Sequence, residues 1–447
     1  MMSRANFYKT LFFALAGLWT GCVRPFEEPV PPALEVVSPD LNQVFLQATI
    51  SIELRPASTF REITWVEING NAASYNPQTG HWVDTLHLNP GLNMLEILAY
   101  DRGGNEGRDT LYAVHLTYRH SSNAPPLPAA RGGHTTTLLN TGDLLVLGGS
   151  PHLQAAAEGS AFLLPSGATA FTRLPFPMVA PRTEHTATRL PDGRVLILGG
   201  SRHQSLQRLD DLEELAEIYD PSSRRFSRIP VIGLPLRRAR HQTIVFPLSS
   251  SEYLVFVTGG FGDSRFGETP VPLRDYRTFL FRNDSLFSLS PDPGFGFELA
   301  DGHTVHPLPG SPQEYLLVGA YFGETRTWTT SLILQPSREG ALFYRSTQHL
   351  PHFPRMEHAA AGIGASFVFI TGGRKDTPDQ PVISEEIYAP LPDQFFYFSL
   401  NGPLPQLPRW DHTATNITNT RILIIGGFNT AGQAIRGSEW FEVQSNN

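Results

Sequence analysis

The chain has 447 residues, which is too long for one ordinary domain and suggests two or three. Hydrophobic residues make up 40% and charged residues only 17%, which excludes a mainly disordered chain. The net charge of −8 excludes strong electrostatic attraction to nucleic acid. Gly (39) and Pro (38) lie in short clusters between apolar runs, which favours many short strands joined by turns.

The first 21 residues are expected to be an export signal, separate from the fold. Arg4 and Lys9 give a positive start, and residues 11–19 form an apolar core too short to cross a bilayer. The core ends in Thr20-Gly21-Cys22, and small residues just before a cysteine resemble the signal peptide of a bacterial lipoprotein. The alternative is an ordinary secretory signal with an incidental cysteine.

Cys22 is the only cysteine, so the mature fold has no intrachain disulfide, cysteine zinc site or catalytic thiol. The resemblance implies that Cys22 is lipidated and holds the protein at the outer membrane; a periplasmic or secreted protein is the alternative. Removal of residues 1–21 takes away two positive charges and changes the net charge from −8 to about −10. Residues 22–32 are Pro-rich and are expected to be an extended tether.

Residues 33–118 are expected to form a β-sandwich of six or seven short strands. Residues 48–54 and 63–68 alternate with period two, and Asn69-Gly70 is a strong tight-turn signal. Segments 66–70, 89–93 and 99–105 resemble the immunoglobulin-like modules of bacterial surface and carbohydrate-active proteins, which are usually spacers. Trp65 and Trp82 could bind sugar, but packing in the core or at the rim is favoured, since strand aromatics usually pack.

Residues 119–447 are expected to form a six-bladed β-propeller, because six segments within 131–445 repeat one template. Each has Arg, two residues, His, small or β-branched residues, and an apolar run that ends in Gly-Gly. The histidines are His134, His185, His241, His303, His358 and His412, and they lie 51, 56, 62, 55 and 54 residues apart. Template and spacing resemble the kelch repeat, which implies blades of four strands. The fourth copy departs from it, with Ala300 for Arg and Gly319-Ala320 for the glycine pair.

The position of each strand follows from its residues. First strands such as residues 135–137 and 186–188 suit the narrow axis, and continuous aliphatic runs suit second strands packed between blades. Glu217-Ile-Tyr219 and Glu386-Ile-Tyr388 resemble the kelch third strand. The last copy ends after three strand-like pieces. We therefore expect residues around 118–130 to supply its outer strand, or this blade to keep three strands.

The repeat histidines raise the possibility of a metal site. Equivalent positions of six blades are spread around a ring, whereas metal ligands must converge on one ion. Repeated structural hydrogen bonding is therefore the favoured interpretation, and no metal or cofactor is expected. Galactose oxidase is a kelch-type enzyme, but its radical cofactor needs a cysteine, and none follows Cys22. A kelch protein that epimerises N-acetylneuraminate is the nearest enzymatic alternative; it would need acid–base groups in a central pocket, for which Glu184, Glu357 and Asp411 are candidates.

The candidate ligand-binding residues are arginines of the template and residues of the loops that follow the glycine pairs. Arginine suits carboxylate or phosphate through paired hydrogen bonds, although a structural role in supporting the first strand is the alternative. The loops into each first strand and out of each second strand share a face, where aromatic and polar groups suit sugar or peptide recognition. The candidates are Arg131, Arg182, Arg238, Arg355, Arg409, Arg202, Tyr321, Phe322, Arg374 and Phe428.

The sequence therefore predicts an all-β, exported, monomeric protein with a six-bladed kelch-type β-propeller and an N-terminal immunoglobulin-like β-sandwich. The predicted function is binding of a protein or glycan ligand at the cell envelope, with an acidic ligand favoured by the arginines. A carbohydrate-active enzyme of the kelch type is the alternative. No catalytic residue is assigned, and propellers serve both classes of function.

Overall fold

The computed structural model describes residues 31–57, 62–263, 269–289, 302–322, 327–377 and 380–444. Cys22 and the expected signal peptide lie outside these residues. Within them the secondary structure consists of β-strands and one short 3₁₀ turn, η1 (Leu209–Asp211). No helix in the described part of the chain is long and apolar enough to span a membrane.

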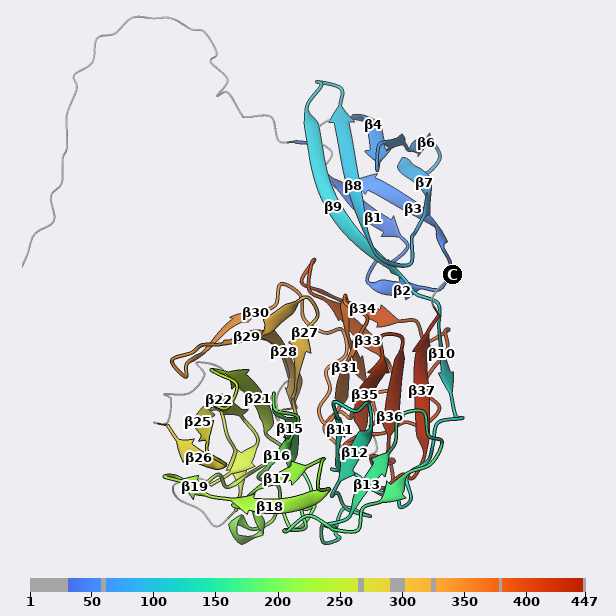
Figure 1. Cartoon of the computed structure of the whole chain (residues 1–447). Helices are drawn as coiled ribbons and strands as arrows, with labels where there is room; N and C mark the ends of the chain where they lie inside the picture. The colour runs from blue at the N-terminus through green and yellow to red at the C-terminus, as the bar shows by residue number, and fades with distance from the viewer. Residues whose placement is uncertain are drawn as a thin grey trace, which may run out of the picture.

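Six sheets of the described residues form the blades of a propeller (Figure 1). Blade one contains β11 (Thr135–Leu138), β12 (Leu144–Leu147), β13 (Ala161–Leu164) and β14 (Thr172–Arg173). Blade two contains β15 (Thr186–Arg189), β16 (Val195–Leu198), β17 (Ala216–Asp220) and β18 (Arg225–Ile229). Blade three contains β21 (Gln242–Pro247), β22 (Tyr253–Thr258), β25 (Tyr276–Arg282) and β26 (Ser285–Ser288), with β19 (Val231–Ile232) at its outer edge.

The other three blades follow in chain order. Blade four contains β27 (Thr304–Leu308), β28 (Ser311–Phe322), β29 (Thr327–Pro336) and β30 (Leu342–Ser346). Blade five contains β31 (Ala359–Ile363), β32 (Phe367–Thr371), β33 (Glu386–Ala389) and β34 (Gln394–Phe398). Blade six contains β35 (Thr413–Thr418), β36 (Arg421–Ile425), β37 (Ser438–Val443) and β10 (Tyr118–Ser121). A small separate sheet joins β20 (Arg238–Ala239), β23 (Phe261–Gly262) and β24 (Val271–Pro272).

The first strands of consecutive blades contact one another, and β35 contacts β11, so the ring is closed (Figure 1). The second strands are its hydrophobic centre: every residue of β12, β16, β22 and β32 is buried. These observations confirm the predicted places of the first and second strands. Blade four is regular despite its degenerate sequence, because β27, β28, β29 and β30 pair in order.

Strand β10 confirms the predicted closure of the ring. It pairs antiparallel with β37, with Tyr118 opposite Val443 and Ser121 opposite Trp440. The Tyr118 ring lies 4.6 Å from that of Phe398 and 5.5 Å from that of Phe441, measured between centroids. The outer strand of the last blade therefore comes from the segment that precedes the first blade.

The N-terminal segment forms two sheets that enclose a separate core, as expected for a β-sandwich. One sheet contains β1 (Leu34–Ser38), β3 (Thr49–Pro56), β7 (His81–His87) and β6 (Ser74–Asn76). The other contains β2 (Gln43–Phe45), β9 (Glu106–His115), β8 (Gly91–Asp101), β4 (Ile63–Ile68) and β5 (Asn71–Ala72). Trp82 packs in this core, whereas Trp65 is half-exposed and its Nε1 donates to Glu67. The immunoglobulin-like class of the module stays a prediction.

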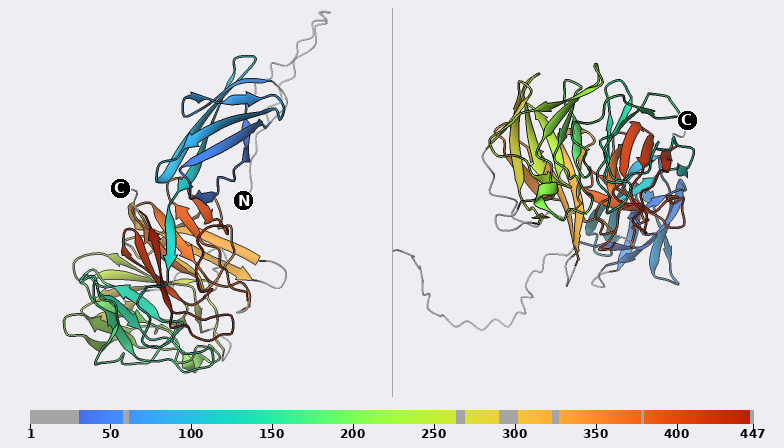
Figure 2. Two further views of the ribbon diagram at one scale, coloured as in Figure 1. Left: turned by 90° about the vertical axis from the view of Figure 1, so that its right-hand side faces the viewer. Right: turned by 90° about the horizontal axis from the view of Figure 1, so that it is seen from below.

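The sandwich and the propeller are joined through one continuous sheet, which the sequence did not indicate. Strand β2 pairs in parallel with β9 on one side and with β34 of blade five on the other. Asn42 Oδ1 accepts a 2.9 Å hydrogen bond from Gln394, and Asp40 Oδ2 accepts one of 2.7 Å from Tyr397. The module is thus bonded to the rim of the propeller (Figure 2, left).

The two faces of the propeller differ. We name one the glycine-pair face, because there each second strand ends and the loop into the next first strand begins. The opposite turn face carries the short turns between first and second strands, such as residues 140–143 and 419–420. The N–H of Val443 donates to the carbonyl of Thr420, so Tyr118, which pairs with Val443, lies at the turn end of blade six. The sandwich lies beyond the outer strand of blade five, at the rim of the ring (Figure 1).

Candidate functional site

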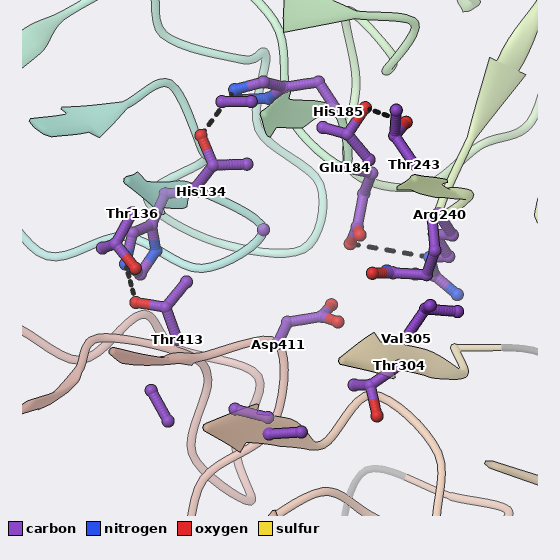
Figure 3. A pocket seen from close by; sticks show the side chains of 18 of the residues that line it. His134, Thr136, Glu184, His185, Arg240, Thr243, Thr304, Val305, Asp411 and Thr413 are labelled. Atoms are coloured by element: carbon purple, nitrogen blue, oxygen red, sulfur yellow. Dashed lines mark hydrogen bonds and ion pairs between the residues drawn. The ribbon is translucent and has the colours of Figure 1, made fainter. Parts of the chain in front are cut away.

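A cavity of about 540 Å³ lies on the propeller axis between the first strands (Figure 3). It extends from the residues just before the repeat histidines along the first strands to Leu138, Arg189 and Pro307 near the turn face. Threonine hydroxyls dominate its wall: Thr135, Thr136, Thr137, Thr186, Thr188, Thr243, Thr304 and Thr413. Among the described residues, no Phe, Tyr or Trp lines it, so it suits a small polar ligand better than an apolar one.

The residue before each repeat histidine has the left-handed backbone conformation in all six blades. Gly133 and Gly302 occupy this position in blades one and four, with φ of 63° and 59°. Four charged residues occupy it in the other blades: Glu184 (φ 56°), Arg240 (φ 57°), Glu357 (φ 55°) and Asp411 (φ 50°). This conformation costs a residue with a side chain roughly 1–2 kcal/mol, which glycine avoids. Four blades thus carry backbone strain in order to place charged groups at the axis.

Glu357 is held as an anion by two guanidinium groups. Arg240 Nη1 lies 2.7 Å from Glu357 Oε1, and Arg374 Nη2 donates to the same oxygen at 2.9 Å. Arg374 Nε also binds Glu357 Oε2, and its guanidinium lies over the Trp410 ring at 5.1 Å. Burial favours the neutral carboxyl, but the two arginines outweigh it and lower the pKa of Glu357. Its side chain is only 1% exposed.

Asp411 and Glu184 line the same cavity, and there the pKa of Asp411 is shifted in the opposite direction to that of Glu357. Burial, together with the negative charges of Glu184 and Glu357, raises the pKa of Asp411 well above its ordinary value. The amide of Gln204 donates to Glu184 and, at 3.3 Å, to Asp411 Oδ2. Arg240 Nε lies 3.5 Å from Glu184 Oε1, as Figure 3 shows. The pKa of Asp411 is thus raised while that of Glu357 is lowered, and pKa values pushed apart in this way let one site hold both an acid and a base.

The repeat histidines join neighbouring blades through threonine hydroxyls. The distances from Nε2 to Oγ1 are 3.0 Å for His185–Thr135, 3.1 Å for His241–Thr186, 3.2 Å for His303–Thr258, 2.8 Å for His358–Thr304 and 3.2 Å for His134–Thr413. The prediction of repeated structural hydrogen bonding is confirmed at these five boundaries. Among the residues that the structure describes, no group of three or more His, Cys, Asp or Glu could hold a metal ion.

The five template arginines lie inside the blades and not around the cavity. In each, Nη1 donates to the carbonyl of the first glycine of its own pair, at distances of 2.6–3.1 Å. Each also forms an ion pair, and the pairs are Arg131–Glu158, Arg182–Glu217, Arg238–Asp275, Arg355–Glu386 and Arg409–Glu439. Their side chains are 0–2% exposed. This placement favours the structural alternative for these five arginines over their candidate role in ligand binding.

The candidates from the loops are not brought together. Arg202 is exposed and lies 3.5 Å from Glu213, while Phe428 is fully buried against Trp410. Tyr321 and Phe322 belong to β28, and their side chains lie outside the described residues. Arg374 contributes to the axial group through Glu357.

Sequence reasoning named Glu184, Glu357 and Asp411 as possible acid–base groups but did not single them out, and it missed the roles of Arg240 and Gln204. A usable signal was present in the repeat. The position before the histidine is Gly in blades one and four and charged in the others. Glycine at this position indicates a left-handed backbone conformation. A charged residue at the equivalent position of another blade is therefore strained, and backbone strain of this kind is typical of functional sites.

Comparisons with known proteins agree with this architecture. No protein-family model matches the chain, and no curated protein matches its sequence. The solved structure of YjhT is similar with a TM-score of 0.55 and 14% identity, over 72% of this chain and 100% of that chain. A novel fungal alcohol oxidase of the AA5 family, in complex with copper, has a TM-score of 0.48 and 14% identity, over 92% of this chain and 76% of that chain. At this identity the likeness to YjhT concerns the fold alone, and it agrees with the predicted all-β propeller fold.

Proposed function

We propose that the axial cavity binds a small hydroxyl-bearing ligand of the sugar class and that its carboxyl groups transfer protons to and from it. The observation that carries the proposal is the left-handed backbone of Glu184, Arg240, Glu357 and Asp411. Glycine fills two equivalent positions, so the fold does not require charged residues there. Strain of this kind persists where function depends on the side chains.

The reaction that fits these groups is interconversion of the two anomers of a reducing sugar. Glu184 takes the proton of the anomeric hydroxyl while Asp411 gives its proton to the ring oxygen. The bond between the anomeric carbon and the ring oxygen breaks, and a carbonyl forms. Rotation and re-closure return both protons, so no oxidant, metal or cofactor is consumed. Glu357, fixed by Arg240 and Arg374, is one of the negative charges that raise the pKa of Asp411 and so help to hold its proton.

Binding of a protein or glycan on the glycine-pair face was the other prediction, and it has less support. Phe428, one of its expected aromatic contacts, is buried, and Arg374 is occupied by Glu357. The cavity instead has converging acid and arginine groups, the feature expected of an enzyme. We therefore favour the enzymatic alternative, a carbohydrate-active protein of the kelch type.

The test is the rate of anomer exchange for a panel of reducing sugars that includes N-acetylneuraminate, measured by NMR. We expect acceleration by the wild type and a loss of at least about 100-fold in Asp411→Asn and in Glu184→Gln, in line with the usual size of acid–base catalysis. Asp109→Asn, which changes an exposed carboxylate on the sandwich, is the control and should retain the wild-type rate. Equal rates in the wild type and Asp411→Asn would refute the proposed roles.

We also propose that lipid on Cys22 anchors the protein to the outer membrane. Its support is the single cysteine at the end of an apolar segment. The wild type should take up a fatty-acid analogue and sediment with membranes, and Cys22→Ser should do neither. A wild-type protein that takes up no label and stays in the soluble fraction would contradict this proposal.

A further inference from the structure

The loop after the second strand of blade two places an uncharged side chain next to the acid–base group. Gln204 of this loop is 2% exposed, and its Nε2 donates to Glu184 Oε1 and, at 3.3 Å, to Asp411 Oδ2. Glu184 and Asp411 belong to blades two and six, which have blade one between them. Both carboxyl groups line the axial cavity, whereas Gln204 is not among the residues that line it. Gln204 therefore holds the two groups together from outside the cavity and is placed to act through them.

The amide of Gln204 is held in one orientation. Its Oε1 accepts a hydrogen bond from the Thr183 hydroxyl, which is closer to this oxygen than to the carbonyl of Gly133, at 3.3 Å. The backbone N–H of Gln204 donates to the carbonyl of Ala155 at 3.4 Å. A primary amide accepts at its oxygen and donates only from its nitrogen. With the oxygen bound to Thr183, the N–H groups are directed at the two carboxyl groups.

The glycine of blade one makes room for this arrangement. Gly133 occupies the position that Glu184 and Asp411 occupy in blades two and six. A Cβ atom on Gly133 would lie 2.3 Å from Thr183 Oγ1 and 2.8 Å from Gln204 Oε1, closer than Cβ atoms approach such neighbours. A side chain at this position would therefore displace the hydroxyl and the amide. Blade one thus lacks a charged residue at the axis where Gln204 needs the space.

The charged groups around Asp411 come from three other blades. They are Glu184 of blade two, Arg240 of blade three, and Glu357 and Arg374 of blade five, while blades one and four have glycine at the equivalent position. Burial is the largest cause of the raised pKa of Asp411, and the charges of Glu184 and Glu357 add to it. Arg240 opposes the shift, and a hydrogen bond with Glu184 increases it. Asp411 and Glu184 therefore compete for one proton.

The two hydrogen bonds of Gln204 are unequal, and their difference acts on this competition. An N–H donor favours the charged form of the carboxyl group that it binds. The hydrogen bond to Glu184 is the shorter of the two, so Gln204 favours negative charge on Glu184 over negative charge on Asp411. The proton is thereby directed to Asp411.

We propose that Gln204 is a positioning residue, which keeps the proton of the carboxyl pair on Asp411 and leaves Glu184 ready to accept one. The inference deepens the proposed function and rests on it for the roles of the two groups. Gln204 decides which group is the acid and which is the base, although it does not line the cavity itself. Thr183 supports this role, because its hydroxyl fixes the orientation of the amide.

The experiment follows both carboxyl groups without a ligand. NMR titration of the full chain with ¹³C-labelled Asp and Glu carboxyl groups reports where each gains its proton, and Asp411→Asn and Glu184→Gln assign the signals. In the wild type, Asp411 should gain its proton at a higher pH than Glu184. Gln204→Met is similar in size and has no donor. Glu184 should then gain its proton about one pH unit higher, the shift expected for loss of one hydrogen bond to a charged group.

Thr183→Val covers the case in which Gln204→Met does not fold, because it keeps Gln204 and removes only the hydroxyl that orients it. It should shift the titration of Glu184 in the same direction. Gln207→Met is the matched control, since Gln207 is an exposed residue of the same loop, and it should titrate as the wild type does. Unchanged titration of Glu184 in every folded variant of Gln204 and Thr183 would overturn the inference.

Sugar anomer exchange separates this inference from the proposed function. Gln204→Met should exchange anomers about tenfold more slowly, with a KM within about twofold of the wild type and the acid limb of its pH–rate profile moved to higher pH. Loss of stability alone would not move this limb. If the titration changes as expected but the wild type accelerates no exchange, the role of Gln204 stands and the proposed reaction fails. If the wild type accelerates exchange and Gln204→Met keeps its rate and its pH–rate profile, the reaction stands and the role of Gln204 fails.

Discussion

At the scale of single residues, the template arginines show how a repeat can be mistaken for a binding motif. Periodicity placed Arg131, Arg182 and their equivalents in one ring, but it carried no information on whether the side chains point to the axis or into the blade. The hydrogen-bond partners determine the direction of each side chain. The carbonyl of the first glycine and a carboxylate from the region of the third strand bind each guanidinium inside the blade. Those carboxylates lie 27 to 37 residues away in the chain, so pairing could not be seen in the sequence alone.

Substitution of one member of such a pair should be strongly destabilising. Arg182→Met leaves Glu217 as an unpaired buried carboxylate, since both side chains are 0% exposed. We expect a loss of about 3–5 kcal/mol in the free energy of unfolding, measured by denaturant titration. Arg102→Met removes the exposed pair with Glu62, where the side chains are 81% and 69% exposed, and should change stability by less than about 1 kcal/mol. Similar losses in the two variants would contradict the structural role of Arg182.

The buried histidines predict the response of stability to acid. Burial, together with neighbouring arginines, lowers the pKa of His134 and of His241 to about 3, against about 6.5 for an unfolded histidine. These residues gain a proton only on unfolding, so their contribution to stability is complete above pH 6.5 and is lost as pH falls towards 3. The slope is about 1.4 kcal/mol per pH unit for each histidine.

The measurement is the melting temperature between pH 8 and pH 4. We expect a steep decrease below pH 6.5, and His134→Gln should make it shallower. His87→Gln alters an exposed histidine of the sandwich and should leave the slope unchanged. A melting temperature that stays constant from pH 7 to pH 4 would show that the repeat histidines are not kept neutral by the fold.

At the scale of strands and blades, the sequence predicted most of the architecture. Aliphatic runs ending in glycine pairs identified the second strands, and Glu217 and Tyr219 lie in β17 as the kelch resemblance implied. The missing strand of blade six was predicted by counting and is β10. The pairing of β2 with β34 was not predicted, because the three residues of β2 carry no pattern that distinguishes a bridge from a loop.

The closing strand should contribute strongly to stability. Tyr118 is 4% exposed and packs between Phe398 and Phe441, so Tyr118→Ala should lower the free energy of unfolding by about 3–5 kcal/mol, the usual loss for a large buried aromatic side chain. Tyr75→Ala is the control, because Tyr75 is 53% exposed on the edge strand β6. Thermal unfolding of the two variants tests this. A smaller decrease for Tyr118→Ala than for Tyr75→Ala would mean that β10 does not hold the ring together.

At the scale of the whole molecule, the propeller brings residues from four blades to one axis. Successive residues of the axial group lie 54 to 117 residues apart in the chain, and only closure of the ring brings them together; they are Glu184, Arg240, Glu357 and Asp411. The sandwich is bonded to β34, the outer strand of blade five, and η1 lies in the long loop after β16. The repeat could therefore be predicted from sequence, whereas the site could not, because it consists of positions where the blades differ.

The most direct test of this account is the melting temperature of Asp411→Gly together with its rate of sugar anomer exchange. Glycine removes the left-handed strain and a carboxyl that burial and two neighbouring carboxylates disfavour. If the charged residues are kept for function, the variant should melt within about 2 °C of the wild type or above it, and it should lose the exchange activity. A melting temperature lower by many degrees with activity retained would show instead that Asp411 is a structural part of the axis.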